Sequence, residues 1–467
     1  MQTENNKATE QVESTVSEET RQETETQTPQ KWRWVEAAVW TVRMLAALVN
    51  GVKGGKWFSL MDKIYAERTL QIAWQRVRSN KGAADIDRIS IERFEGQAEQ
   101  YLQELHEQLK TGTYQPLAVK RVNIPKASGG TRPLGIPTVK DRVVQMAIKL
   151  AIEPIFEHTF RDSSHGFRPE RSGKDALREV DTWLKAGYTW VVDADIKGYF
   201  DNISHELMLS KVEQYIADKQ LLRLLESYLK QDIITECASW KPSQGTPQGA
   251  VLSPLLANIY LNELDHLIGE KYRMVRYADD FVILTTCEAD AENALAEVRE
   301  WMASHQLELH PDKTRIVNET DDPNGFDFLG YTFKKGMRLL RKKSRVAMRD
   351  KIRLHTRRSQ GVGITTVIEK LNPILRGWFN YFKHVKKSEL KAMDGFVRRR
   401  LRSILRKYQK KGGGTGRNIE DHQQWTNTHF ASLGLFTMDE AHAEASRSRL
   451  GNYQLESRVR ENRKAFT

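Results

Sequence analysis

Four aspartates lie in apolar surroundings at two separate places in the chain. Asp193 and Asp195 end one apolar run, and Asp279 and Asp280 lie between two others. A carboxylate in such surroundings is unfavourable unless it is paired or binds a cation. Mg²⁺ prefers carboxylate oxygens and completes its coordination with substrate phosphates. Two such ions roughly 4 Å apart can stabilise the attacking and leaving oxygens of phosphoryl transfer. These acids therefore predict a two-metal site if the fold brings them together.

The second pair of acids also has a simpler explanation. Short apolar runs over Met274–Tyr277 and Phe281–Leu284 predict a β-hairpin with Asp279 and Asp280 at its tip. Aspartate is favoured in tight turns for conformational reasons, so this pair alone would indicate only a turn. The strand predicted over Tyr188–Asp195 supplies the further carboxylates that a metal site requires.

A basic hairpin precedes the acids in the chain. Two strand-like runs flank a glycine-containing turn at residues 128–130, and their cations are Lys120, Arg121, Lys126 and Arg132. Charged side chains also protect the exposed edge of an ordinary hairpin. A plain edge hairpin and a phosphate-binding finger are both compatible with these residues.

Helices and strands alternate along the chain. The spacing of apolar residues predicts helices over Trp34–Val49, Leu60–Val77, Ile91–Leu109, Asp141–Phe156, Ser204–Tyr228, Ala250–Leu267 and Ala291–His305. Further strands are predicted over Leu307–Val317 and Phe326–Phe333, and a glycine-rich turn over Gln244–Gly249. This mixture, without an internal repeat, predicts an α+β fold.

Positive charge is concentrated behind this α+β region. The whole chain has 73 Lys and Arg and a net charge of +12. Residues 334–411 alone contain 26 Lys and Arg against four acids, so the rest of the chain is net acidic. An excess of this size is typical of a surface that displaces counterions from a phosphate backbone.

The basic segment has the apolar periodicity of two amphipathic helices between Thr366 and Tyr408. Asn372 is predicted to cap the first long helix, with Pro373 at its opening position. Gly395 is the weak point of the second helix. Beyond the three glycines at 412–414, the remaining apolar residues are sufficient for a small docked element.

Composition limits the class of protein further. With 467 residues, the chain is expected to fold as more than one domain. Cys237 and Cys287 lie too far apart in sequence for a zinc module or a disulfide framework, which favours a reducing cytoplasm. The apolar stretch over 34–49 is too short for a membrane span, and the first thirty residues fit neither a signal nor a transit peptide.

Several sequence motifs resemble those of the reverse transcriptase family, and they occur in the same order as in that family. DIKGYFDNI at 195–203, TPQG at 246–249 with LSPLLAN at 252–258, and YADD at 277–280 resemble its palm. RPLGIP at 132–137 and GFRP at 166–169 are similar to its finger motifs. RGWFNYF at 376–382 is similar to the maturase region of group II intron proteins. Over about residues 60–410, the chain thus resembles group II intron-encoded reverse transcriptases.

This resemblance implies a right-hand polymerase whose catalytic residues are Asp195, Asp279 and Asp280. Two Mg²⁺ ions would lie at Asp195, Ile196 and Asp279. Deoxynucleoside triphosphates would be bound by Lys126, Arg132, Phe200, Gln248, Gly249 and Lys313. In such a site Phe200 obstructs a 2′-hydroxyl, and the cations stabilise charge on the triphosphate.

The resemblance also implies a division of the chain and a set of partners. The expected parts are a polar tail at 1–30, an N-terminal extension and fingers at 31–180, a palm at 181–335, an α-helical thumb or maturase domain at 336–411, and a nucleic-acid-binding tail at 412–467. The thumb would contact RNA through Arg376, Arg398, Arg399, Arg400, Arg402, Arg406 and Lys407. Expected partners are group II intron RNA and an RNA template with a DNA primer or target DNA, in a cytoplasmic bacterial ribonucleoprotein away from membranes.

Other interpretations account for fewer residues. A viral RNA polymerase usually has glycine before its paired acids and lacks the aromatic found here at Phe200. Retron and diversity-generating enzymes are closer, but the block at 246–249 and the maturase-like helices argue against them. A polymerase-inactive, RNA-binding splicing cofactor would share the helices, although the intact acids argue against it. Without a Cys- and His-rich module behind the helices, second-strand cleavage of target DNA is not expected.

Overall fold

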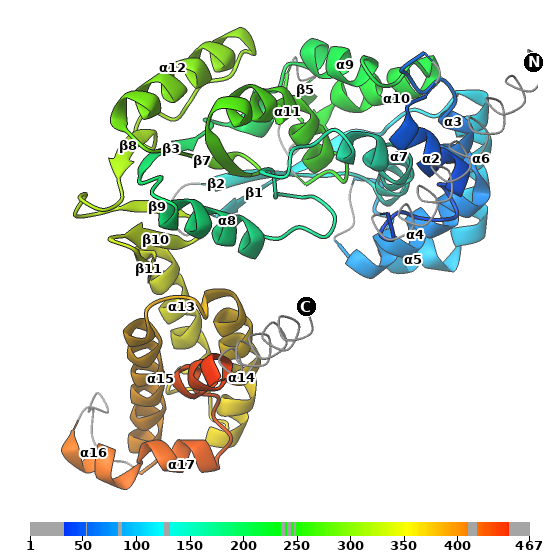
Figure 1. The fold of residues 1–467 in the computed structure, drawn as a ribbon. Coiled ribbons are helices and arrows are strands. Elements are labelled where there is room, and N and C mark those ends of the chain that lie inside the picture. Colours follow the sequence, from blue (N-terminus) through cyan, green and yellow to red (C-terminus); the bar gives the residue numbers. More distant parts are fainter. Residues whose placement is uncertain are drawn as a thin grey trace, which may run out of the picture. The chain divides into compact units, whose positions relative to one another are not determined.

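The computed structural model describes residues 32–52, 54–82, 86–125, 131–234, 239–240, 244–246, 249–409 and 418–447 (Figure 1). They belong to two compact units, Met1–Trp183 with Ala194–Ile316 and Leu184–Asp193 with Val317–Thr467. Lys126, Gln248, the tail at 1–30 and the glycines at 412–414 lie outside the described residues, as does the side chain of Arg132. Every helix within the described ranges is too short or too polar to span a bilayer.

The first unit begins with short helices packed around one buried helix. They are α2 (Val42–Asn50), α3 (Met61–Tyr65), α4 (Glu67–Asn80), α5 (Ile91–Gly96) and α6 (Ala98–Thr111). α3, α4 and α6 contact α7 (Val139–Glu157), which is buried on nearly all sides. The helix predicted from Trp34 begins only at Val42, because the Thr41 hydroxyl caps it by accepting from the Met44 amide.

The predicted basic hairpin is present in a small sheet of the first unit. β1 (Val119–Pro125) pairs antiparallel with β2 (Thr131–Ile136), with Lys120 opposite Ile136. β4 (Ile233–Ile234) and β5 (Ser239–Trp240) complete the order β2-β1-β4-β5. This pairing confirms the hairpin predicted from the two strand-like runs.

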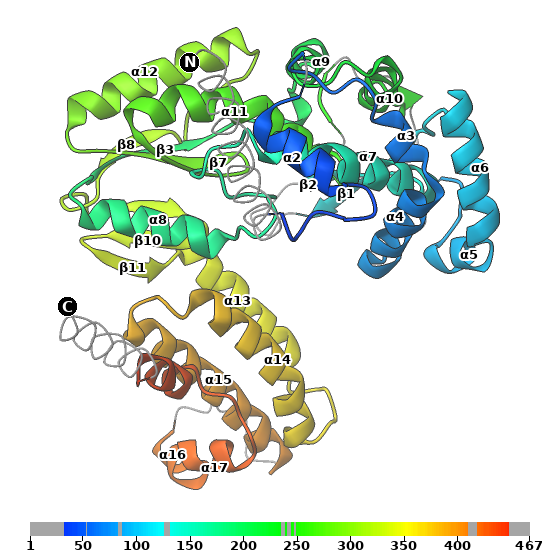
Figure 2. The same ribbon diagram turned by 45° about the vertical axis from the view of Figure 1, so that its right-hand side comes forward.

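A second sheet carries the predicted acids. Its order is β6-β7-β3-β8, formed by β3 (Trp190–Asp195), β6 (Arg273–Tyr277), β7 (Asp280–Thr285) and β8 (Arg315–Asn318). α11 (Ser253–Lys271) contacts β6, and α12 (Glu288–Ser304) contacts β7, so both helices cover one face of these strands (Figure 2). The remaining elements are α8 (Gly173–Lys185), the 3-10 turn η1 (Tyr199–Asp201), α9 (His205–Glu213) and α10 (Lys219–Leu229). The prediction of one long strand over Leu307–Val317 was wrong, because this segment forms only an isolated bridge at Leu309 and the beginning of β8.

The second unit contains a three-stranded sheet and a helical bundle. The strands, in the order β11-β10-β9, are β9 (Phe326–Phe328), β10 (Tyr331–Lys334) and β11 (Met337–Leu340). The single strand predicted over Phe326–Phe333 is divided by a turn at Leu329 and Gly330, both with positive φ. The helices are α13 (Lys342–His355), α14 (Ile364–Phe382), α15 (Lys387–Tyr408), α16 (Ile419–Gln424) and α17 (Asn427–Ser432).

Asn372 does not cap a helix as predicted. α14 begins at Ile364 and continues through Pro373. The Asn372 amide instead donates to the Gly434 carbonyl at 2.8 Å and accepts from the Phe436 amide at 2.9 Å. Asn372 therefore docks the C-terminal segment, in which Trp425, Phe430 and Leu435 are buried.

Burial of Asp141 at the start of α7 generates a prediction about pH. Burial raises the pKa of Asp141 from 3.8 to about 6, although the Tyr114 and Thr138 hydroxyls donate to it at 2.5 and 2.7 Å. The folded protein therefore binds this proton more tightly than the unfolded chain, and the associated stability is lost as pH rises from about 4 to 6. The free energy of unfolding, measured with urea, should be about 2–3 kcal/mol higher for Asp141→Asn than for wild type at pH 7. This difference should disappear near pH 4.

Asp175→Asn is the matched control for this measurement. The Ser172 hydroxyl bond lowers the pKa of Asp175, so its ionised form stabilises the fold and the substitution should be unfavourable at pH 7. A pH-independent difference between wild type and Asp141→Asn would contradict the assignment of this proton.

Candidate active site

The end of β3 and the tip of the β6–β7 hairpin hold the predicted acids. β3 ends at Asp195, its neighbour β7 begins at Asp280, and Ala278 and Asp279 form the hairpin tip. Burial raises the pKa of Tyr199, shortly after Asp195; the charge of Arg276 opposes this increase, and the charge of Asp279 adds to it. Asp195 at the end of β3 and Asp279 directly before β7 are thus carried by neighbouring strands of one sheet.

Asp195 already has a cationic partner. Lys313 Nζ donates to Asp195 Oδ1 at 2.8 Å, and the two side chains are 52% and 32% exposed. The backbone is joined as well, because the His310 amide donates to the Asp195 carbonyl at 2.8 Å. An ion pair this exposed is worth only about 0–1 kcal/mol, so the Lys313 ammonium can be transferred to another anion at small cost.

Phe200 lies against the glycine-rich turn. It is 8% exposed in η1, and its carbonyl accepts from the Thr246 amide at 2.7 Å. The Gly245 amide donates to the Ile203 carbonyl at 2.7 Å, and a Cβ at Gly245 would lie 2.8 Å from the Asp201 carbonyl oxygen. Only glycine permits this close approach, which joins the turn to the segment after Asp195.

Gly249 joins the same turn to the basic hairpin. Its φ is +112°, and a Cβ there would lie 2.7 Å from the Gly135 carbonyl oxygen and 2.8 Å from Leu134 Cδ1 of β2. A side chain at this position would therefore push the turn away from β2. η1 is therefore in contact with the glycine-rich turn, and this turn is in contact with β2. Two of the predicted nucleotide-binding residues, Phe200 and Gly249, lie in these segments.

Arg276 was missed by the sequence analysis, which counted it within an apolar run. Its side chain is fully buried in β6, and its Nε and Nη2 donate to the two Asp265 carboxylate oxygens at 2.7 and 2.5 Å. Burial opposes the positive charge, but Asp265 outweighs burial and raises the pKa of Arg276 above its usual range. A charged residue inside an otherwise apolar strand was the signal that could have indicated this site.

The loop before α8 contacts the hairpin tip directly. The Arg276 amide donates to the Ser163 carbonyl at 2.9 Å, and the His165 amide donates to the Arg276 carbonyl at the same distance. A Cβ at Gly166 would lie 2.3 Å from the Ala278 nitrogen, so the two backbones are in contact. The GFRP motif therefore begins with a glycine because a side chain would displace the tip that carries Asp279.

The acids fit a divalent cation that takes few protein ligands. Within the described ranges, no three His, Cys, Asp or Glu side chains are arranged to hold a metal ion by themselves. Asp195 and Asp279 are nevertheless hard oxygen donors carried by neighbouring strands of one sheet. Mg²⁺ commonly uses one or two carboxylates and takes its remaining ligands from water and substrate phosphates.

Three predicted RNA-binding arginines of the second unit make contacts inside it. Arg400 donates to the hydroxyl and the carbonyl of the buried Thr356 at 3.0 and 2.7 Å. Arg402 is 3% exposed and donates to the Trp425 carbonyl at 2.9 Å. Arg406 pairs with the buried Asp421 at 2.8 Å. The prediction that Arg402 contacts RNA was wrong, because the C-terminal segment covers it. Arg406 likewise holds that segment, whereas Arg376 and Lys407 are exposed.

Other arginines gather around one aromatic ring. The guanidinium groups of Arg349, Arg353 and Arg399 lie 5.4, 5.5 and 5.0 Å from the centre of the Phe396 ring. We call these four residues the arginine cluster. Burial, followed by the charges of Arg358, Arg353 and Arg399, lowers the pKa of the neighbouring Arg400. Like charges this close repel one another, so an anion at the cluster would be stabilised.

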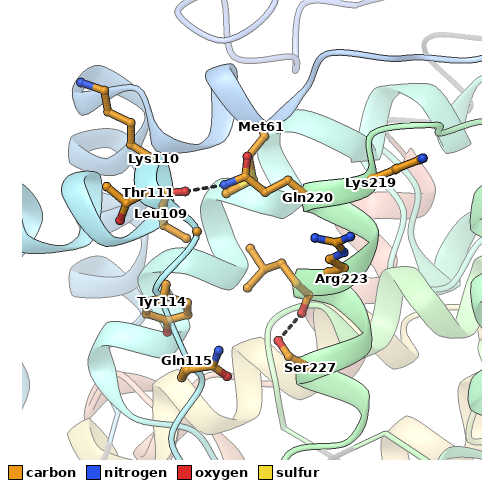
Figure 3. A pocket seen from close by; sticks show the side chains of 12 residues that line it. Met61, Leu109, Lys110, Thr111, Tyr114, Gln115, Lys219, Gln220, Arg223 and Ser227 are labelled. Carbon is orange, nitrogen blue, oxygen red and sulfur yellow. Dashed lines mark hydrogen bonds between the residues drawn. The ribbon is translucent and has the colours of Figure 1, made fainter.

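A pocket of about 570 Å³ lies between the end of α6 and one face of α10 (Figure 3). Lys110, Lys219 and Arg223 line it, and no acid is among its described lining residues. In Figure 3 the side chains of Lys110 and Lys219 point away from each other, so the cations do not converge on one point. None of the predicted site residues lines this pocket.

Two families match successive parts of the chain. Residues 124–333 match Reverse transcriptase (RNA-dependent DNA polymerase), and residues 345–422 match Group II intron, maturase-specific domain. The palm sheet, the basic hairpin and the first match together define a reverse transcriptase. The second match covers most of α13 to α15, which confirms a helical maturase domain behind the polymerase.

Three relatives show how far the similarity extends. Protein YkfC of Escherichia coli is 37% identical over 309 residues, or 57% of this chain and 79% of that protein. Group II intron-encoded protein LtrA of Lactococcus lactis is 41% identical over 198 residues, or 42% of this chain and 33% of LtrA. The putative COX1/OXI3 intron 2 protein of Saccharomyces cerevisiae is 24% identical over 413 residues, or 74% and 47% of the two chains. The chain belongs to the group II intron reverse transcriptase and maturase family.

Proposed function

We propose that the protein copies group II intron RNA into DNA by two-metal nucleotidyl transfer, and that its helical unit binds the intron RNA. The observation that carries this proposal is the sheet order in which β3, ending at Asp195, neighbours β7, beginning at Asp280. The matches to the polymerase and maturase families support the same function.

The proposed reaction lengthens a DNA primer. The primer 3′-hydroxyl attacks the α-phosphorus of a deoxynucleoside triphosphate, the bond to pyrophosphate breaks, and the hydroxyl proton leaves to solvent. Divalent ions, when bound, stabilise the attacking and leaving oxygens. Asp195, the Ile196 backbone and Asp279 would hold two Mg²⁺ ions, with Asp280 supporting the tip. Lys313 would leave Asp195 for the pyrophosphate as negative charge develops there.

We assign selection of the nucleotide to η1, the glycine-rich turn and β2. Phe200 would lie under the sugar and obstruct a 2′-hydroxyl, while Gln248 and Gly249 form the adjoining wall. Lys126, which follows β1 in the sequence, and Arg132 of β2 would contact the triphosphate. The contact between Gly249 and β2 supports this arrangement because it joins the pocket wall to the finger.

RNA binding is assigned to the arginine cluster in place of Arg402 and Arg406. Three guanidinium groups around one ring form a compact positive surface, and phosphates are the anions that RNA offers. Arg398, Arg400, Arg376 and Lys407 extend the proposed surface. Such contacts hold RNA by its backbone and carry no base specificity.

Primer extension on an RNA template with Mg²⁺ and deoxynucleotides tests the metal assignment. Asp279→Asn should reduce the extension rate by about 10³-fold or more, because a metal ligand is lost. The matched control Asp290→Asn changes an acid in the first turn of α12 and should keep the wild-type rate. Wild-type extension by Asp279→Asn would remove the assignment, and no cDNA from wild type that still binds RNA would favour a splicing cofactor alone.

Competition between ribo- and deoxynucleotides tests Phe200. Phe200→Val should lower the preference for deoxynucleotides by about 10- to 100-fold, because the obstruction at the 2′-hydroxyl is reduced. The ratio of kcat/KM for the two nucleotide types is the measurement. Phe160→Val shortens an aromatic that is 7% exposed and should leave this ratio unchanged. An unaltered ratio in Phe200→Val would assign Phe200 to the core.

The salt dependence of RNA binding tests the arginine cluster. Arg349→Gln with Arg399→Gln should weaken binding to a group II intron transcript and reduce the slope of log K against log salt by about 1.5. Arg353 is left unchanged in this test because it pairs with Asp350. The matched control, Lys230→Gln with Lys271→Gln, removes two exposed cations that pair with Glu226 and Glu297. Equal slopes for the two double variants would exclude the cluster from the RNA interface.

A further inference from the structure

All five N–H groups of the Arg276 guanidinium are engaged. Besides the two bonds to Asp265, Nη1 donates to Asn258 Oδ1 at 3.0 Å and to the Ala278 carbonyl at 2.9 Å. Nη2 also donates to Ser164 Oγ at 2.8 Å. Ser164, Asn258 and Asp265 are buried and come from the loop before α8 and from α11. One side chain thus joins three segments that are distant in the sequence.

These contacts close a ring around the hairpin tip. Asn258 accepts from Arg276, and its Nδ2 donates to the Gly166 carbonyl at 2.8 Å. Gly166 in turn contacts the Ala278 nitrogen, and the Ala278 carbonyl accepts from Arg276. The residue directly before Asp279 is therefore held on both sides, at its nitrogen and at its carbonyl.

Ala278 has a backbone conformation that requires such support. Its φ is +61°, in the left-handed region that residues other than glycine rarely adopt. This conformation costs about 1–2 kcal/mol for a residue with a Cβ. It persists only where surrounding contacts determine it, and the residue that directly follows this turn position is Asp279.

We propose that Arg276 is a positioning residue for Asp279: by binding the Ala278 carbonyl it sets the turn that presents the Asp279 carboxylate to the metal. This inference rests on the proposed function, in which Asp279 is a metal ligand. It adds a residue that does not touch the reacting atoms and acts through the backbone.

Stability alone is a weak explanation for this ion pair. Replacing a buried pair by apolar residues of similar volume is often neutral or stabilising, because two charges lose their hydration. The five-donor fork has a geometry that lysine cannot reproduce, since an ammonium offers three donors from one point. Arg276→Lys therefore keeps the charge opposite Asp265 and loses the connection to Ala278.

The test compares Arg276→Lys and Asn258→Ala with wild type in full-length protein. Asn258→Ala removes one acceptor and the Gly166 contact without leaving a buried charge unpaired, so it serves if Arg276→Lys does not fold. Arg402→Lys, which alters a buried arginine of the second unit, is the control for a general loss of stability. Each variant is measured for its unfolding temperature, its active fraction and its extension rate as a function of Mg²⁺ concentration.

The half-saturating Mg²⁺ concentration should rise about tenfold in Arg276→Lys and less in Asn258→Ala, since losing support of a metal ligand typically costs 10- to 100-fold in affinity. High Mg²⁺ should restore much of the rate, and the Km for primer–template should stay constant. Arg402→Lys should lower only the unfolding temperature. Unchanged Mg²⁺ dependence in both test variants, with Asp279→Asn inactive, would overturn the positioning role and leave the proposed function intact. Activity in Asp279→Asn would instead overturn both.

Discussion

A guanidinium without any exposed surface imposes the strictest physical constraint in the polymerase unit. Removing such a charge from water costs several kcal/mol, and this is offset only when every donor finds an acceptor. For Arg276 the acceptors come from a loop, a helix and the hairpin tip. The charge can therefore be buried only after all three segments have reached their final positions, which couples the local geometry of the acids to the folding of the whole unit.

The same helix connects this constraint to the nucleotide side of the site. α11 supplies Asn258 and Asp265 to Arg276, and it begins at Ser253, soon after Gly249 contacts β2. The glycine turn ahead of it is joined to η1 through Gly245 and Thr246. The hairpin tip is thus bonded to α11, and the glycine turn that contacts η1 and β2 directly precedes this helix in the chain.

Features that depend on neighbouring residues in the chain could be predicted from the sequence. The hairpins at 119–136 and 273–285 follow from strand-like or apolar runs on either side of turn residues, and the acids follow from their apolar neighbours. What could not be predicted depends on partners far along the chain. Asn372 looked like a cap because the segment that binds it lies 62 residues later. Arg276 looked like part of an apolar run because its partner Asp265 belongs to a different element. Helical periodicity placed Arg402 on a polar face but could not show that other residues cover that face.

The covering of Arg402 and Arg406 has a consequence for the electrostatics of the helical unit. Two of the positive charges in this region are bonded within the unit. Arg402 donates to the Trp425 carbonyl, and Arg406 donates to the Asp421 carboxylate. Detaching α16 and α17 would expose the guanidinium groups of Arg402 and Arg406 and strengthen the attraction of the bundle to any polyanion. The C-terminal segment thus keeps the charges of Arg402 and Arg406 away from solvent.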